Sequence, residues 1–169
     1  MSGTGGTAGS DGGTAGSVAG SAGAGGASAP VASFTFTNSG SNATITTLTG
    51  SGAVSQEYNS PETAMYFTDD TNTARHLTID LWSSGTTIMV GSFTVSSYDA
   101  AGDAWISYFE GTPQQVLQWN ATSGSVTIDT VSGKEFTFTV HSVVMAADGE
   151  IGPAMGTFTL DGTGTGLLP

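Results

Sequence analysis

Hydrophobic and polar residues alternate with a period of two from Val31 onward. In residues 31–37, alanine and phenylalanine occupy one parity while serine and threonine occupy the other. Successive side chains of a strand point to opposite faces, so this pattern predicts a half-buried strand. Similar stretches are residues 43–49, 53–58, 64–68, 76–82, 87–97, 104–109, 115–119, 125–130, 135–145 and 155–160.

Turn residues separate these stretches, for example at Ser84-Gly85 and Asp148-Gly149. Strands that recur every 8 to 12 residues or so are typical of sandwiches and barrels. We therefore predict an all-β domain, an Ig-like or jelly-roll-like β-sandwich with about seven or more strands in two packed sheets. The expected core residues are Phe34, Phe36, Ile79, Leu81, Ile128, Phe136, Phe138, Val140 and Phe158.

Two local features can be predicted as well. Residues 126–130 and 136–140 are apolar at alternate positions on either side of Ser132-Gly133, which predicts a β-hairpin. In Ser60-Pro61-Glu62-Thr63, serine can cap a helix and proline suits its first position. We expect a single helical turn there, because strand-forming residues follow at once.

The first 30 residues have a different composition. Gly5-Gly6-Thr7-Ala8-Gly9-Ser10 is nearly repeated in residues 12–17, and the stretch is almost entirely Gly, Ser, Thr and Ala. Such a segment cannot bury enough apolar surface to offset its conformational entropy, so it is expected to be disordered or extended. We divide the chain into a low-complexity arm, residues 1–30, and a β-sandwich domain, residues 31–169.

Charge restricts the partners. The 169 residues include 14 acidic side chains and only two fixed cations, Arg75 and Lys134, for a formal charge of -12. Nucleic acids and anionic membranes are poor partners, since neutralising phosphates requires Lys and Arg. Charged residues make up 9 % of the chain, against about 25 % in ordinary proteins. A surface rich in hydroxyls favours an extracellular or cell-surface location, with cations, neutral sugars or other protein chains as partners.

Several functional classes lack their motifs. Without cysteine there is no disulfide, thiolate catalysis or Cys-ligated zinc, and no apolar run is long enough to predict a membrane span. Nucleophile elbows, phosphate loops and dinucleotide fingerprints are also missing. His76 and His141 are isolated in predicted strands. We expect a protein that is not an enzyme, although a carboxylate pair for glycoside cleavage is conceivable among Glu57, Glu62, Glu110, Glu135 and Asp80.

Two kinds of binding site remain as hypotheses. Asp69, Asp70 and Asn72 supply several oxygens in one turn and form a candidate calcium site, although Asp-rich turns are common in solvated loops. Trp105, Trp119 and Tyr108 are candidates for a ligand-binding platform on which sugars stack. Trp82, Tyr58, Tyr66 and Tyr98 are further aromatic candidates. Core positions are the alternative for all of these aromatic residues.

The arm with its Gly-Gly-Thr-Ala-Gly-Ser repeat resembles the linker that follows the lipidated cysteine of bacterial surface lipoproteins. Residues 124–129, 133–140 and 156–160 are similar to the closing hairpins of small lipoprotein β-sandwich domains of unknown function. The resemblance covers about 50 residues and includes no lipobox cysteine. It implies surface display and no known reaction.

Three functional interpretations follow. The first is a noncatalytic extracellular or cell-surface domain acting in adhesion or assembly. The second is a self-assembling structural subunit of a filament or phage particle, whose arm contacts neighbouring chains. The third is a carbohydrate-binding or carbohydrate-active module. A cleft that brings two carboxylates together with a tryptophan would favour this interpretation.

Overall fold

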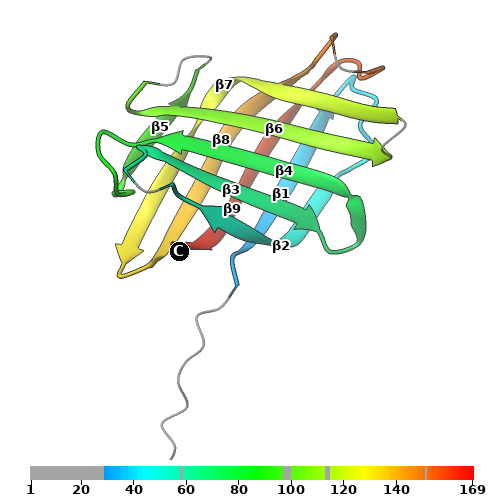
Figure 1. The fold of residues 1–169 in the computed structure, drawn as a ribbon. Coiled ribbons are helices and arrows are strands. Elements are labelled where there is room, and N and C mark those ends of the chain that lie inside the picture. Colours follow the sequence, from blue (N-terminus) through cyan, green and yellow to red (C-terminus); the bar gives the residue numbers. More distant parts are fainter. Residues whose placement is uncertain (1–28, 58, 97–99, 113–114, 151) are drawn as a thin grey trace, which may run out of the picture.

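The computed structural model describes residues 29–57, 59–96, 100–112, 115–150 and 152–169, and this part of the chain is all-β, as predicted (Figure 1). Its strands are β1 (Val31–Ser39), β2 (Thr47–Ser55), β3 (Glu62–Asp69), β4 (Asn72–Trp82), β5 (Gly91–Val95), β6 (Asp103–Thr112), β7 (Gln115–Ser132), β8 (Glu135–Ala147) and β9 (Thr157–Leu167). Among the residues described, no helix is long and apolar enough to cross a membrane.

The strands belong to a single sheet that closes on itself. Their order is β1-β2-β3-β4-β6-β5-β7-β8-β9, and β1 pairs with β9 to complete the barrel. In Figure 1, β2, β3, β4 and β6 form a front layer that crosses over β1, β9, β8 and β7 behind it. The two layers therefore face each other across one core, as in a sandwich, but hydrogen-bonded strands connect them on both sides.

Strand β5 fills the place where β6 and β7 separate. The second half of β6 pairs directly with the start of β7, whereas β5 lies between the two strands at the other end. Strand β7 serves both pairings because bulges shift its register between Ala121 and Ser125. Gly124 makes this possible: its φ is 113°, and a Cβ there would lie 2.6 Å from Val143 Cα.

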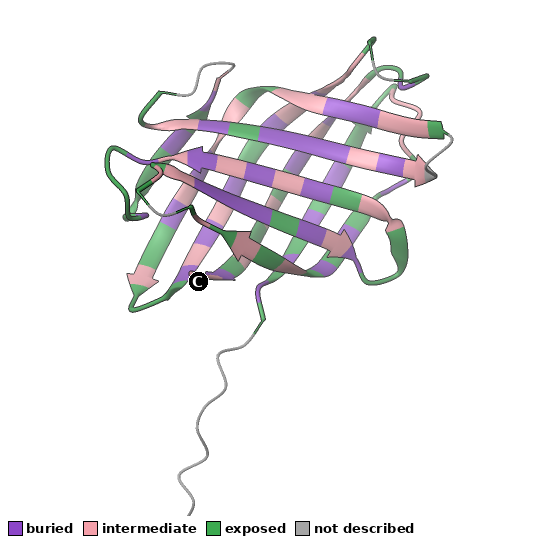
Figure 2. Cartoon of the chain, viewed as in Figure 1, coloured by how far each residue is buried: buried purple, intermediate pink, exposed green. Residues whose placement is uncertain are grey.

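The core is built from inward-facing side chains at alternate strand positions, visible as the purple bands in Figure 2. All nine predicted core residues are buried, which confirms that part of the prediction. The rings are accommodated because β9 presents glycines to the interior. A Cβ on Gly164 would lie 2.5 Å from the Phe138 ring, and one on Gly166 would lie 2.0 Å from the Phe136 ring.

The two local predictions had different outcomes. The hairpin at Ser132-Gly133 is present as β7 and β8, with Ile128 opposite Phe138. A bulge then shifts the register, so Thr130 pairs with Thr137. The helical turn predicted at residues 60–63 is wrong, because β3 begins at Glu62 and pairs with β4 from its first residue. Ser60 Oγ accepts the Glu62 N–H at 3.1 Å and thus closes a turn ahead of the strand.

Candidate functional site

The structure separates the predicted aromatic platform into two environments. Trp105 lies on the outer face of β6 and is 37 % exposed. Tyr108 and Trp119 are paired in register on the inner face, are fully buried, and have ring centroids 5.8 Å apart. The latter two therefore belong to the core and cannot stack on a ligand beside Trp105. Tyr58 and Tyr98 lie outside the described residues.

A second exposed aromatic side chain on the outer surface is Tyr66 on β3, which is 48 % exposed. Asp80 on β4 lies opposite Ala64 on one side and opposite Trp105 on the other. Because side chains two apart share a strand face, Glu62 and Tyr66 flank Ala64 on that same surface. We call the outer surface of β3, β4 and β6 that carries Glu62, Tyr66, Asp80 and Trp105 the aromatic face.

A chain of hydrogen bonds holds Trp105 in place. Its indole Nε1 donates to Ser107 Oγ at 2.7 Å, and that hydroxyl donates to Asn120 Oδ1 at 2.9 Å. Asn120 Nδ2 in turn donates to Asp148 Oδ2 at 2.9 Å. The indole is thus tied to the residue two positions further along β6, and its only N–H is already satisfied. What Trp105 offers a partner is its ring surface.

Asp80 is a half-buried carboxyl on the aromatic face. Burial raises the pKa of its carboxyl to about 6, and the negative charge of Glu62 adds to the effect. Burial likewise raises the pKa of Tyr66, with Asp80 and Glu62 contributing. Within the described part of the chain, the Asp80 carboxylate accepts no hydrogen bond and forms no ion pair. Its oxygens are therefore available to a ligand.

A small hollow adjoins the aromatic face. It has a volume of about 80 Å³ and is lined by Ser55, Glu57, Ser60, Glu62, Ala64 and Tyr66. Ala64 has a shorter side chain than Glu57, Glu62 and Tyr66, which line the hollow with it. Polar oxygens and one tyrosine thus surround a space that suits a single small polar group.

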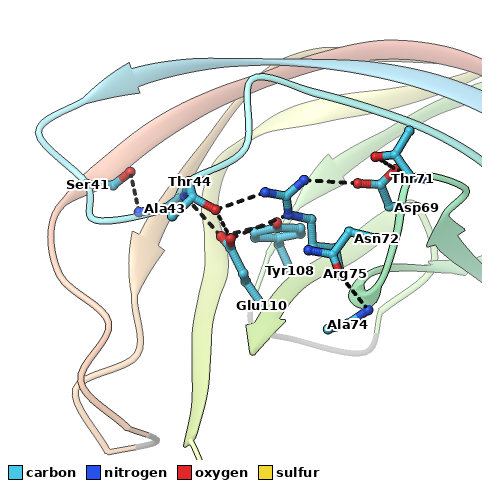
Figure 3. Close-up of polar contacts among 10 residues, drawn as sticks. All are labelled: Ser41, Ala43, Thr44, Asp69, Thr71, Asn72, Ala74, Arg75, Tyr108 and Glu110. Atoms are coloured by element: carbon cyan, nitrogen blue, oxygen red, sulfur yellow. Dashed lines mark hydrogen bonds and ion pairs between the residues drawn. The ribbon is translucent and has the colours of Figure 1, made fainter. Parts of the chain in front are cut away.

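A second acidic region lies at one end of the barrel (Figure 3). We call it the Arg75 network; its members are Thr44, Asp69, Thr71, Arg75, Tyr108 and Glu110. The guanidinium of Arg75 contacts Asp69 Oδ2 at 3.2 Å and Glu110 Oε1 at 3.4 Å, and it donates to Thr44 Oγ1 at 2.9 Å. The Thr44 backbone N–H and hydroxyl both donate to Glu110, which fastens the loop before β2 to β6.

The Arg75 network changes the ionisation of its members in opposite directions. Burial would raise the pKa of Asp69, but hydrogen bonds from Thr71 and the Arg75 guanidinium hold that pKa below its ordinary value. Burial raises the pKa of Tyr108, and Glu110 adds to the shift. The Tyr108 hydroxyl donates to Glu110 Oε2 at 3.4 Å. Each buried polar group here has partners, so the network holds the fold together.

The predicted calcium ligands face different partners. Asp69 is fully buried and ion-paired to Arg75, whereas Asp70 is exposed and its Oδ1 accepts the Ser51 N–H at 3.3 Å. Asn72 Oδ1 accepts the Ala74 N–H at 3.1 Å. The described residues contain no group of three or more His, Cys, Asp or Glu arranged to hold a metal. Calcium binding at this turn remains a prediction from the sequence alone.

The remaining candidates are spread over the barrel. His76 lies on β4, where its Nδ1 is 3.2 Å from Thr68 Oγ1, and His141 lies on β8 in the other layer. Of the five carboxylates considered for glycoside cleavage, Glu62 and Asp80 share the aromatic face and Glu57 lines the hollow beside it. The proximity of these residues could not be predicted from the sequence, because it depends on strand order.

No protein family, curated protein or solved structure matches this chain.

Proposed function

We propose that the chain is a noncatalytic binding domain, extracellular or displayed on a cell surface, that acts in adhesion or assembly by engaging another protein chain through the aromatic face. The observation that carries this proposal is the exposed pair Tyr66 and Trp105 beside Asp80, a carboxylate without a protein partner in the described structure. Exposed aromatic residues are typical anchors of protein interfaces, and unpaired polar groups at such a surface gain from a complementary partner.

A noncatalytic role is supported by the openness of the site. Glu62 and Asp80 lie on the outside of a sheet, and the adjoining hollow of about 80 Å³ cannot enclose a substrate. Acid–base catalysis needs its groups placed around a reacting atom in a site from which water is excluded. An open surface is better suited to holding a partner than to transforming one.

A carbohydrate-binding module is the second candidate, and the same two rings favour it. Tyr66 and Trp105 can stack on the apolar face of a sugar, and Asp80 can accept hydrogen bonds from its hydroxyls. Catalysis by this module would require Glu62 and Asp80 to act on a glycosidic bond. Assembly through the N-terminal arm remains a prediction, since residues 1–28 lie outside the described structure.

The proposal is tested by adhesion of beads that carry the full chain to surfaces coated with acidic, neutral or basic polypeptides and with neutral polysaccharides. We expect adhesion to at least one coating and its loss in the double variant Tyr66→Ser with Trp105→Ser. The matched control is Val31→Ser with Met155→Ser, which removes two exposed apolar side chains elsewhere. Failure of wild-type beads to adhere to any coating would overturn the proposal, as would equal losses in both double variants.

A further inference from the structure

The charge balance of the aromatic face is incomplete in the described structure. Glu62 is close enough to Asp80 to disfavour ionisation of the Asp80 carboxyl, and Glu57 lines the hollow next to them. The two fixed cations of the chain are engaged elsewhere: Arg75 in its network, and Lys134 at the β7–β8 hairpin, where its Nζ donates to the Pro169 carbonyl at 2.7 Å. A positive group from outside would compensate these carboxylates.

The aromatic rings favour an organic cation over a metal ion as that positive group. A bare metal ion wants several converging oxygens, whereas an organic cation also gains from the face of a tyrosine or tryptophan ring. Tyr66 borders the hollow, and Trp105 lies across Asp80 from Ala64. The surface therefore combines ring faces with carboxylates, the combination that complements an ammonium or guanidinium carried on an apolar stem.

We infer that the aromatic face binds a lysine or arginine side chain of a partner protein, with the cationic head in the hollow beside Glu57, Glu62 and Tyr66 and the stem passing over Ala64 toward Asp80 and Trp105. This inference rests on the proposed function and names the partner's chemistry at the same site. The lining of the hollow fits the cationic head, because its carboxylates and the Ser55 and Ser60 hydroxyls are all able to accept hydrogen bonds. An anionic ligand would meet repulsion at every one of these carboxylates.

Binding of a cation is linked to the proton of Asp80. The Asp80 carboxyl has its pKa raised to about 6, so it is partly protonated in mildly acidic solution. A bound ammonium favours the ionised form, and the linkage is reciprocal. The affinity for a cationic ligand should therefore fall as the pH is lowered through about 6. The affinity for a neutral sugar has no such dependence on the charge of Asp80.

The test is calorimetric titration of the full chain with tetralysine, with its fully acetylated counterpart and with a neutral trisaccharide. The key variant is Glu62→Gln with Asp80→Asn. Its matched control is Asp129→Asn with Glu135→Gln, which removes two carboxylates from the other layer and changes the net charge by the same amount. We expect tetralysine affinity to drop about tenfold or more in the key variant, about 1.4 kcal/mol, and to change little in the control.

Two further arms separate the possible failures. Tyr66→Phe should keep part of the affinity and Tyr66→Leu should lose it, because the Tyr66 ring borders the hollow that holds the cationic head. Equal losses in both charge variants would overturn the inference, because attraction would then come from net charge alone. Binding of the trisaccharide but not of tetralysine would also overturn it, while leaving the aromatic face as a binding site. The proposed function itself fails only if the bead assay fails.

Discussion

Two acidic regions of the barrel differ in how their carboxylates are compensated. In the Arg75 network, Asp69 and Glu110 are buried, and both contact the same guanidinium. On the aromatic face, Glu62 and Asp80 lie near each other and near two exposed rings, and neither carboxylate forms an ion pair with a described residue. A buried charge is tolerated when it is paired and hydrogen-bonded, and it destabilises the fold when it is not. The comparison indicates that the first region stabilises the domain, whereas the carboxylates of the second, for which we propose a binding role, are left without a counter-charge in the described structure.

The largest expected effect comes from removing the cation of the first region. Arg75→Met leaves Asp69 and Glu110 buried without a counter-charge, so we expect the free energy of unfolding to fall by about 3 to 5 kcal/mol. Urea denaturation followed by tryptophan fluorescence measures this change. Lys134→Met is the control, since the Lys134 side chain is exposed and its Nζ donates to the Pro169 carbonyl without pairing with a buried carboxylate. Similar losses in the two variants would contradict a structural role for the network.

Removing a charge from the second region should have the opposite sign. Asp80→Asn takes away a half-buried carboxylate whose ionised form is disfavoured by burial and by Glu62. We expect stability at neutral pH to rise by about 1 kcal/mol, a value reduced for partial solvent screening. Asp129→Asn is the matched control, because the Asp129 carboxylate accepts a hydrogen bond from Thr139 at 2.8 Å and its loss should not stabilise the fold. A destabilised Asp80→Asn protein would show that Asp80 has a structural partner.

The pH dependence of stability should show both regions at once. The pKa of Asp80 is higher in the folded state, at about 6 against an ordinary 3.8, so the folded state binds more protons and stability should rise as the pH falls through this window. The pKa of Asp69 is lowered by folding, so its contribution is present above the ordinary value and is lost on further acidification. Thermal melts across this range should give a maximum between the two limbs. In the Asp80→Asn variant, stability should depend less on pH on the high-pH side of the maximum. A stability–pH profile unchanged by that substitution would refute the attribution of this dependence to Asp80.

The smallest effect is expected at the exposed rings. Tyr66→Ser removes a side chain that is 48 % exposed and accepts or donates no hydrogen bond within the described structure, so stability should change by no more than about 0.5 kcal/mol. Chemical denaturation provides the measurement. Trp119→Ser serves as the contrast, because that ring is fully buried and its loss should cost several times more. A large loss in Tyr66→Ser would mean that the ring belongs to the fold.

Alternation along the chain was enough to predict the all-β fold, the core residues and the β7–β8 hairpin, because these follow from short-range spacing. It divided β7 into two strands, residues 115–119 and 125–130, because the bulges between Ala121 and Ser125 interrupt the alternation. It could not predict which way Trp119 points, since the bulges of β7 change the parity of the strand between Trp119 and Val126. It also could not assemble the aromatic face. That face exists because β6 pairs with β4, while β5, which precedes β6 in the chain, lies on the far side of β6. Strand order is a long-range property that a period-two pattern does not contain.

The Arg75–Asp69 pair was missed for a different reason. The sequence places Asp69 beside Asp70 and Asn72 in one oxygen-rich turn, yet consecutive residues at the end of a strand point to opposite faces. Asp69 faces the interior and meets Arg75 across the β3–β4 hairpin, while Asp70 is exposed. Phe67 is a buried residue of β3, and Asp69 follows it by two positions, so the alternation of this strand already places Asp69 on the inner face and Asp70 on the outer one.

Closure of the barrel by its first strand has a mechanical consequence. Strand β1 lies between β2 and β9 and is paired to both over most of its length. A pull on the chain ahead of Val31, directed along β1, acts at right angles to the hydrogen bonds on both sides. Those bonds are then strained together in shear, whereas a peeling force would break them one after another. A domain held by its N-terminal end should accordingly resist traction better than the same domain pulled sideways from its last strand.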